Sequence, residues 1–276
     1  MASLFSGLSS LVPGVLMRGQ ELYEVYSSSS TGPKVEKYCR IAKALYSEGC
    51  CSSAQLTLSL AKSAVDATQA NTLFGMDKIQ WLCQIAEVRS LLAPTVLSAE
   101  IIQAVSLVEQ VPHNDRTPIL AWSEIFYEIA KGHIGTKASD QAKSFLQRAR
   151  EYGRSNDLPL ESVDILCKIA SAQKLIDEGD AVVTLEAAFE IVRGMSKEFY
   201  LLVDCSSVVG RITHISLLYT SISCQKATEV VGFADQIIKN YTPDGNMEIE
   251  KAKELIKNAR TVTSVWMRET LTNSKI

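Results

Sequence analysis

The chain has 276 residues, and with 46% hydrophobic and 21% charged residues its composition is that of a folded protein rather than a disordered one. Its 28 basic residues against 31 acidic ones give a formal net charge of -3, which argues against a dedicated nucleic-acid binder because such proteins usually carry a basic excess. Every apolar run stops well short of the roughly 18 residues needed to cross a bilayer, so membrane insertion is not expected.

Residues 1–32 form an atypical N-terminal segment that is rich in Ser and Gly and ends in the run Ser27–Ser30. We predict a short helix over Val15–Tyr26 and a flexible chain elsewhere in this segment. The apolar stretch lacks the preceding basic residues of a signal peptide. Three interpretations stay open: an end that docks on the first helical hairpin, a membrane-surface or export segment, and a leader for a bacterial secretion machine.

From residue 33 onwards, apolar residues recur at three- and four-residue spacing between the prolines, which is typical of amphipathic helices. Residues 160–177 show one such stripe, made of Val163, Leu166, Ile169, Ala170, Gln173 and Ile176. The β-branched segments, such as Val182–Val183, are short and lie within the helical periodicity. The sequence therefore predicts an all-α fold.

A short motif of the form bulky–x–x–Ile–Ala occurs four times along the chain. Its isoleucines are Ile41, Ile85, Ile129 and Ile169, which lie 44, 44 and 40 residues apart. We predict a fifth, degenerate copy at Val209–Gly210, another 40 residues along. A turn and a second helix with regular alanines follow each motif, so a period of roughly 40 residues predicts an α-solenoid of about five antiparallel hairpins.

The motif on the first helix, the Gly-containing turns (Glu48–Gly49 and Glu178–Gly179) and an Ala-x-x-x-Leu pattern on the second helix resemble tetratricopeptide-repeat-like helical hairpins over roughly residues 34–240. HEAT-like arrays have periods nearer to about 40–47 residues, so this subtype stays open. The resemblance implies a right-handed superhelix whose concave face binds peptides or proteins.

We expect three regions: a flexible segment over 1–32, a helical-repeat array over 33–243, and a C-terminal capping helix and tail over 244–276. Residues 246–271 carry one apolar side, made of Ile249, Ala252, Leu255, Ile256, Ala259, Val262, Val265 and Trp266. Because a helical array needs a terminal helix with a polar outer face, this stretch is suited to be the cap.

The 7 cysteines are unevenly spaced and include no Cys-x-x-Cys pair, which fits reduced thiols in a cytoplasmic protein. Cys39, Cys83 and Cys167 occupy one repeat position, about 10 Å apart from copy to copy, which is too far for disulfides. We expect them to pack as small apolar side chains. For the adjacent Cys50 and Cys51, turn packing and surface oxidation are the two alternatives.

Catalytic and metal-binding signatures are not found. His113, His133 and His214 lie in different copies and form no metal-binding pair; His113 is expected in a solvated loop, and His214 on a helix, either structural or on a concave surface. The chain has no nucleophile elbow, phosphate loop or dinucleotide-binding turn. We therefore expect no enzyme activity, no metal and no cofactor.

Polar residues flank the Ile–Ala pair in each copy and would align into a column when the copies stack. We predict this column as the partner-binding site, formed by Arg40, Lys43, Gln84, Glu87, Glu128, Lys131 and Lys168. The alternative is a solvated convex stripe. The expected function is a non-catalytic scaffold, adaptor or chaperone-like module that binds a protein or peptide. Whether the protein also forms a homo-oligomer stays open. The alternative is a self-assembling structural protein whose N-terminal segment docks on a neighbouring subunit.

Overall fold

The computed structural model describes residues 22, 25, 30–68, 75–93, 97–110, 119–134, 138–155, 157–195, 205–241 and 247–273. Throughout these ranges the regular structure is helical and contains no strand, which confirms the all-α prediction. Most of the helix predicted over Val15–Tyr26, and His113 with its loop, lie outside the described residues.

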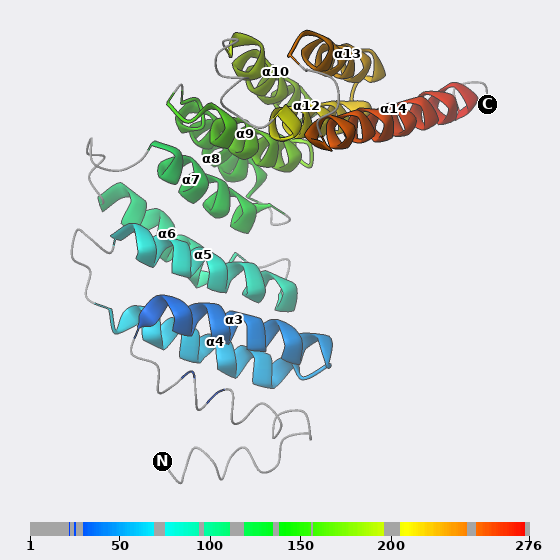
Figure 1. The fold of residues 1–276 in the computed structure, drawn as a ribbon. Coiled ribbons are helices and arrows are strands. Elements are labelled where there is room, and N and C mark those ends of the chain that lie inside the picture. The colour runs from blue at the N-terminus through cyan, green and yellow to red at the C-terminus, as the bar shows by residue number, and fades with distance from the viewer. Residues whose placement is uncertain are drawn as a thin grey trace. The chain divides into compact units, whose positions relative to one another are not determined.

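The helices follow one another as consecutive pairs (Figure 1). The pairs within the described ranges are α3 (Thr31–Ser47) with α4 (Cys51–Asp66), α5 (Gly75–Leu92) with α6 (Ala99–Gln110), α7 (Ile119–His133) with α8 (Ser139–Tyr152), α9 (Pro159–Gln173) with α10 (Glu178–Gly194), and α12 (Cys205–Thr220) with α13 (Cys224–Tyr241). The longer helix α14 (Met247–Asn273) ends the series.

The contacts divide the chain into two compact units, and the division passes through α7 and α8. The first unit comprises residues 1–117 and 128–145, and the second comprises residues 118–127 and 146–276. In the first unit, α3 packs on α4 and on α5, and α5 packs on α6. In the second unit, α9 packs on α10 and on α12, and α12 packs on α13 and α14. In each unit a first helix thus contacts both its own partner and the next first helix.

The four repeated motifs have one burial pattern. Ile41, Ile85, Ile129 and Ile169 are at most 1% exposed. The alanine after each isoleucine is buried as well, whereas the polar residue before it is exposed in three motifs and half-buried in the third, at Glu128. Each motif is therefore the core-facing stripe of the first helix of its pair, as the helical spacing predicts.

The fifth copy lies six residues beyond the predicted Val209–Gly210. Ile215 and Ser216 are buried and follow the exposed His214, which is the pattern of the other copies, whereas Val208, before Val209, is itself buried. The second helix agrees: the backbone N–H of Ala181 bonds to Asp177 O, and that of Ala227 bonds to Ser223 O, at the same place in α10 and α13. The spacing from the fourth copy is thus 46 residues rather than 40.

The second helices contact their partners through small residues. Four of them share a buried Ala–x–x–x–Leu/Val–x–x–Ala pattern, at Ala54/Leu58/Ala61, Ala142/Leu146/Ala149, Ala181/Leu185/Ala188 and Ala227/Val231/Ala234. The backbones approach closely enough for hydroxyls of the first helix to reach them: Ser123 Oγ donates to Ala149 O at 2.7 Å and Ser216 Oγ donates to Ala227 O at 2.9 Å. Small side chains permit this close approach.

Helix α14 departs from its predicted pattern. Ile249, Ala252, Ile256 and Ala259 are buried where α14 packs on α12 and α13. The other half of the predicted apolar side is exposed, namely Leu255, Val262, Val265 and Trp266. The buried residues already recur at three- and four-residue spacing and so form one complete stripe along the helix. The exposed residues therefore form a second stripe beside it.

Candidate functional site

The seven residues of the predicted binding column lie on the outer sides of first helices. Arg40 and Lys43 are exposed on α3, and Gln84 and Glu87 are exposed on α5. Glu128 and Lys131 are half-buried on α7, and Lys168 is exposed on α9. Lys168 belongs to the second unit, whereas the other six belong to the first.

Most of these charges form ion pairs with one another or with a neighbour. Lys43 Nζ lies 3.1 Å from Glu87 Oε1 and thereby links α3 to α5. Lys131 pairs with Glu128 on its own helix at 3.0 Å, and Lys168 Nζ lies 3.6 Å from Glu124 Oε1 of α7. Exposed pairs of this kind stabilise a protein by about 0–1 kcal/mol each. A partner that binds these charges has to replace interactions that already exist.

Cys39, Cys83 and Cys167 are buried, and all seven cysteines are free thiols. Burial disfavours the charged thiolate, which raises the pKa of Cys39 and of Cys167 to about 12 and raises that of Cys83 as well. Since the thiolate is the reactive form, these side chains are inert packing residues at neutral pH. The exposed Cys51 begins α4, and Cys50 beside it is half-buried.

The two histidines within the described ranges have different environments. His133 is 3% exposed and its ring stacks on Phe145 with centroids 5.6 Å apart. Burial lowers the pKa of His133 below its ordinary value because it disfavours the charged ring. His214 is exposed on α12 and takes the place of Arg40 in the fifth copy. It therefore extends the exposed polar positions of the first helices into α12. The predicted site omitted His214 because the fifth copy was predicted six residues too early in the chain.

No group of three or more His, Cys, Asp or Glu side chains among the described residues is arranged to hold a metal ion. In the same part of the chain, none of the helices combines the length and the apolar character needed to cross a membrane.

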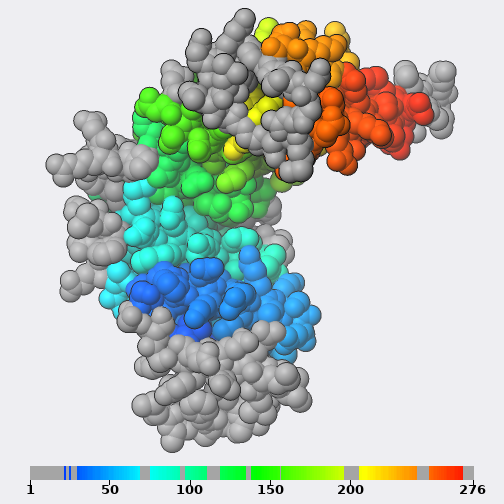
Figure 2. All heavy atoms as spheres, in the orientation of Figure 1, coloured from blue at the N-terminus to red at the C-terminus, as the bar shows by residue number. Residues whose placement is uncertain are grey.

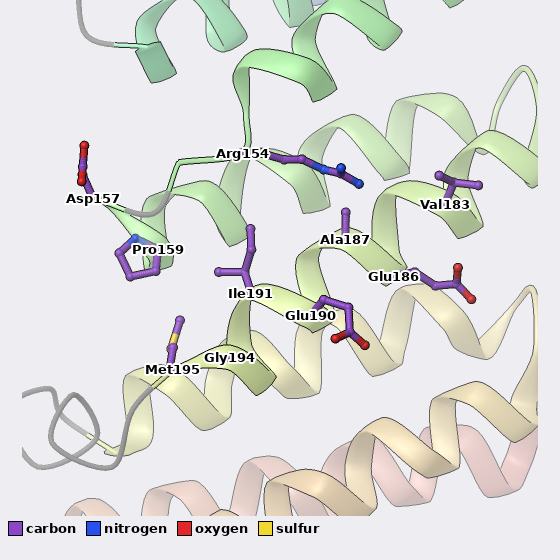
Figure 3. Close-up of a pocket in the computed structure, with 10 residues that line it drawn as sticks. All are labelled: Arg154, Asp157, Pro159, Val183, Glu186, Ala187, Glu190, Ile191, Gly194 and Met195. Carbon is purple, nitrogen blue, oxygen red and sulfur yellow. The ribbon is translucent and has the colours of Figure 1, made fainter.

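An open cleft of about 1070 Å³ lies in the second unit between α10 and the connection from α8 to α9 (Figure 3). Helix α10 contributes one side, from Val183 through Ala187 to Gly194, and Arg154 and Asp157 line the other. Val183 is 46% exposed and Ile191 is half-buried, while Ala187, between them along α10, is buried. The Arg154 side chain points toward α10 in Figure 3.

Acidic groups predominate around this α10 cleft. Glu186, Glu190 and Asp157 line it, against the single guanidinium of Arg154. Glu186 pairs with Lys226 of α13 at 3.4 Å, and Glu190 pairs with Arg193 at 2.9 Å. The cleft thus offers a narrow apolar stripe between carboxylates. One sequence signal pointed to it: α10 carries Val183 and Ile191 on a side of the helix other than the buried stripe through Ala181 and Leu185.

No protein-family model matches the chain, and neither the curated proteins nor the solved structures gave a significant match.

Proposed function

We propose that this protein is a non-catalytic interaction scaffold, an adaptor or chaperone-like module whose helical hairpins stack as a right-handed tetratricopeptide-like superhelix and bind a protein or peptide. The α10 cleft is the observation that carries this proposal. It places the exposed Val183 and the half-buried Ile191 beside Glu186 and Glu190 on one helix, and recognition surfaces combine an apolar centre with a polar rim in this way.

The cleft is a stronger candidate for the main contact than the predicted column. Apolar area buried at the centre of an interface provides affinity, whereas exposed charges chiefly affect specificity and association rate. Val183 and Ile191 supply such area, whereas the seven column residues are all polar or charged. The column then serves as a second, polar contact along the first helices.

The charges of the cleft indicate a segment with aliphatic and basic side chains as its occupant. Its acids outnumber its single arginine, and Glu186 and Glu190 are one turn apart on α10. A helix carrying leucines on one side and lysines beside them would place its apolar side chains over Ala187 and its ammonium groups near these carboxylates.

Fluorescence anisotropy with the full chain tests this proposal. The probes are three synthetic helical peptides of one pattern that pair leucine with lysine, with glutamine or with glutamate. We expect the lysine peptide to bind most tightly and the glutamate peptide least. Replacing Val183 and Ile191 together by serine should weaken binding at least about tenfold, since removing a central contact commonly costs more than 1 kcal/mol.

A matched control replaces Leu175 and Leu217 by serine, because both are exposed aliphatic residues of the second unit outside the cleft. This control should bind as the wild type does. The triple variant Arg40→Ala, Gln84→Ala and Lys168→Ala examines the predicted column: a loss of affinity there, with the serine pair unaffected, moves the main contact to the first helices. Failure of all three peptides to bind, together with no stoichiometric protein recovered from native lysate, would contradict the scaffold function.

A further inference from the structure

Helix α14 presents a second apolar stripe beside the face that packs on α12 and α13. Leu255, Val262, Val265 and Trp266 are 37–46% exposed. At about 100° per residue, these four side chains share an arc of about 100° with three exposed polar residues. Together they form the α14 outer face: Lys251, Leu255, Asn258, Val262, Val265, Trp266 and Glu269. The C-terminal end of α14 extends past α12 and α13 (Figures 1 and 2), whereas Thr263 still bonds to Thr220 of α12.

Six of the seven residues of this face form pairs that are symmetric about position 260; the exception is Trp266, whose counterpart is Glu254. Lys251 and Glu269 lie nine residues to either side of it, and Leu255 and Val265 lie five residues to either side. Asn258 and Val262 lie two residues to either side. Arg260 itself points elsewhere and pairs with Asp235 of α13. The face therefore has an apolar centre, a positive end and a negative end.

We propose that the α14 outer face binds the same face of a second copy of this chain, as an antiparallel helix pair centred on residue 260. A twofold axis there brings Lys251 of each copy opposite Glu269 of the other, and Leu255 opposite Val265. In a twofold interface each contact occurs twice, so this one pairing brings opposite charges together at both ends. A parallel pair would instead place like charges opposite each other at both ends, which disfavours that arrangement.

The size of the contact sets the expected strength. From Lys251 to Glu269 the helix rises about 27 Å, and one helix pair of this length buries less than the roughly 1,200–2,000 Å² of a stable interface. We expect a dimer whose population rises with concentration in the micromolar range. This self-association is independent of the partner binding proposed for the α10 cleft.

Sedimentation equilibrium of the full chain over a range of concentrations tests the proposal by reciprocal charge exchange. Lys251→Glu places two carboxylates opposite each other at both ends, and Glu269→Lys places two ammonium groups there. Each single variant should weaken dimerisation at least about tenfold, and the double variant Lys251→Glu/Glu269→Lys should restore it. Lys253→Glu makes the same charge change on the opposite side of α14 and should leave the dimer intact.

Thermal melting followed by circular dichroism verifies that each variant is folded, and the two singles and the double provide three independent readings. The proposal is overturned if the wild type stays monomeric at all concentrations. It is also overturned if the double variant dimerises as weakly as the two single variants. It is likewise overturned if Lys253→Glu disrupts the dimer as strongly as Lys251→Glu.

Discussion

At the scale of single residues, burial determines the chemistry of the titratable side chains. The ring of His133 is packed on Phe145 in the interior of the first unit, and its pKa lies below the ordinary value because burial disfavours the charged form. The thiols of Cys39, Cys83 and Cys167 are kept protonated for the same reason. These groups therefore contribute packing rather than reactivity.

The first prediction concerns acid sensitivity. His133 takes up a proton more readily in the unfolded chain than in the folded one, so its contribution to stability is complete above about pH 6.5, the ordinary histidine value. That contribution declines as the pH falls through 6.5 toward the lower pKa of the folded state. Urea unfolding between about pH 5 and 8 should show this loss, and His133→Leu should flatten the profile. A profile as steep in His133→Leu as in the wild type would contradict this assignment.

The second prediction separates packing from binding. Replacing Cys39, Cys83 and Cys167 together by alanine removes a buried sulfur from three first helices, at about 0.5–1.5 kcal/mol per site. The melting temperature should fall by several degrees while peptide affinity stays unchanged in the folded protein. Cys51→Ala, at an exposed position, should melt like the wild type. A triple variant as stable as the wild type would show that the sulfurs contribute no packing energy.

At the scale of elements, helices α6 and α7 meet at Gly132. A Cβ at this position would overlap Cγ1 and Cδ1 of Ile101, so no side chain fits without displacing that residue. Close contact at a glycine explains why a residue of low helix propensity lies within α7.

Gly132→Ala should therefore destabilise the protein. Overpacking costs about 1–3 kcal/mol, which exceeds the roughly 1 kcal/mol that alanine gains over glycine in a helix. In a double-mutant cycle measured by chemical denaturation, the loss should shrink when Ile101→Ala provides the missing space. Gly194→Ala, where a Cβ meets no atom within 4 Å, is the matched control and should be neutral or stabilising.

The sequence predicted the element types well and their register only in part. Four motifs with an identical Ile–Ala pair gave correct core positions, because α-helical spacing alone decides which residues face inward. The fifth motif was predicted at the wrong position for two reasons. Its isoleucine is followed by Ser216 rather than by alanine, and α12 has further buried residues at Val208 and Val209. Only packing distinguishes these two stripes of α12.

At the scale of the whole molecule, the first helices α3 and α9 contact the first helix of the next hairpin in their unit, α5 and α12 respectively. Ile169 is buried in α9, which contacts both α10 and α12. Ile169→Asp introduces an unpaired charge into this contact and should cost several kcal/mol. Circular dichroism should show a loss of helix larger than α9 alone. Lys168→Gln, on the adjacent exposed residue, should leave the spectrum and melting unchanged; equal melting of the two variants would contradict the assigned register.

The α10 cleft could not be predicted from the sequence, and the reason is spatial. Its stripe on α10 is visible as Val183 and Ile191, but Arg154 and Asp157 arrive from a connection about thirty residues earlier. No helical periodicity relates the stripe on α10 to this connection. The predicted column, by contrast, was inferred from the period alone. In the structure, two of its residues from different copies, Lys43 and Glu87, form an ion pair.

The three buried thiols offer a way to time the opening of individual hairpins. A protonated, enclosed sulfur reacts with an alkylating reagent only when its surroundings open, so its labelling rate reports the free energy of that local opening. Cys39, Cys83 and Cys167 lie on α3, α5 and α9, one per hairpin. Mass spectrometry of the labelled peptides would therefore rank three hairpins by their opening energies without introducing any probe, and the exposed Cys51 would supply the unprotected reference rate.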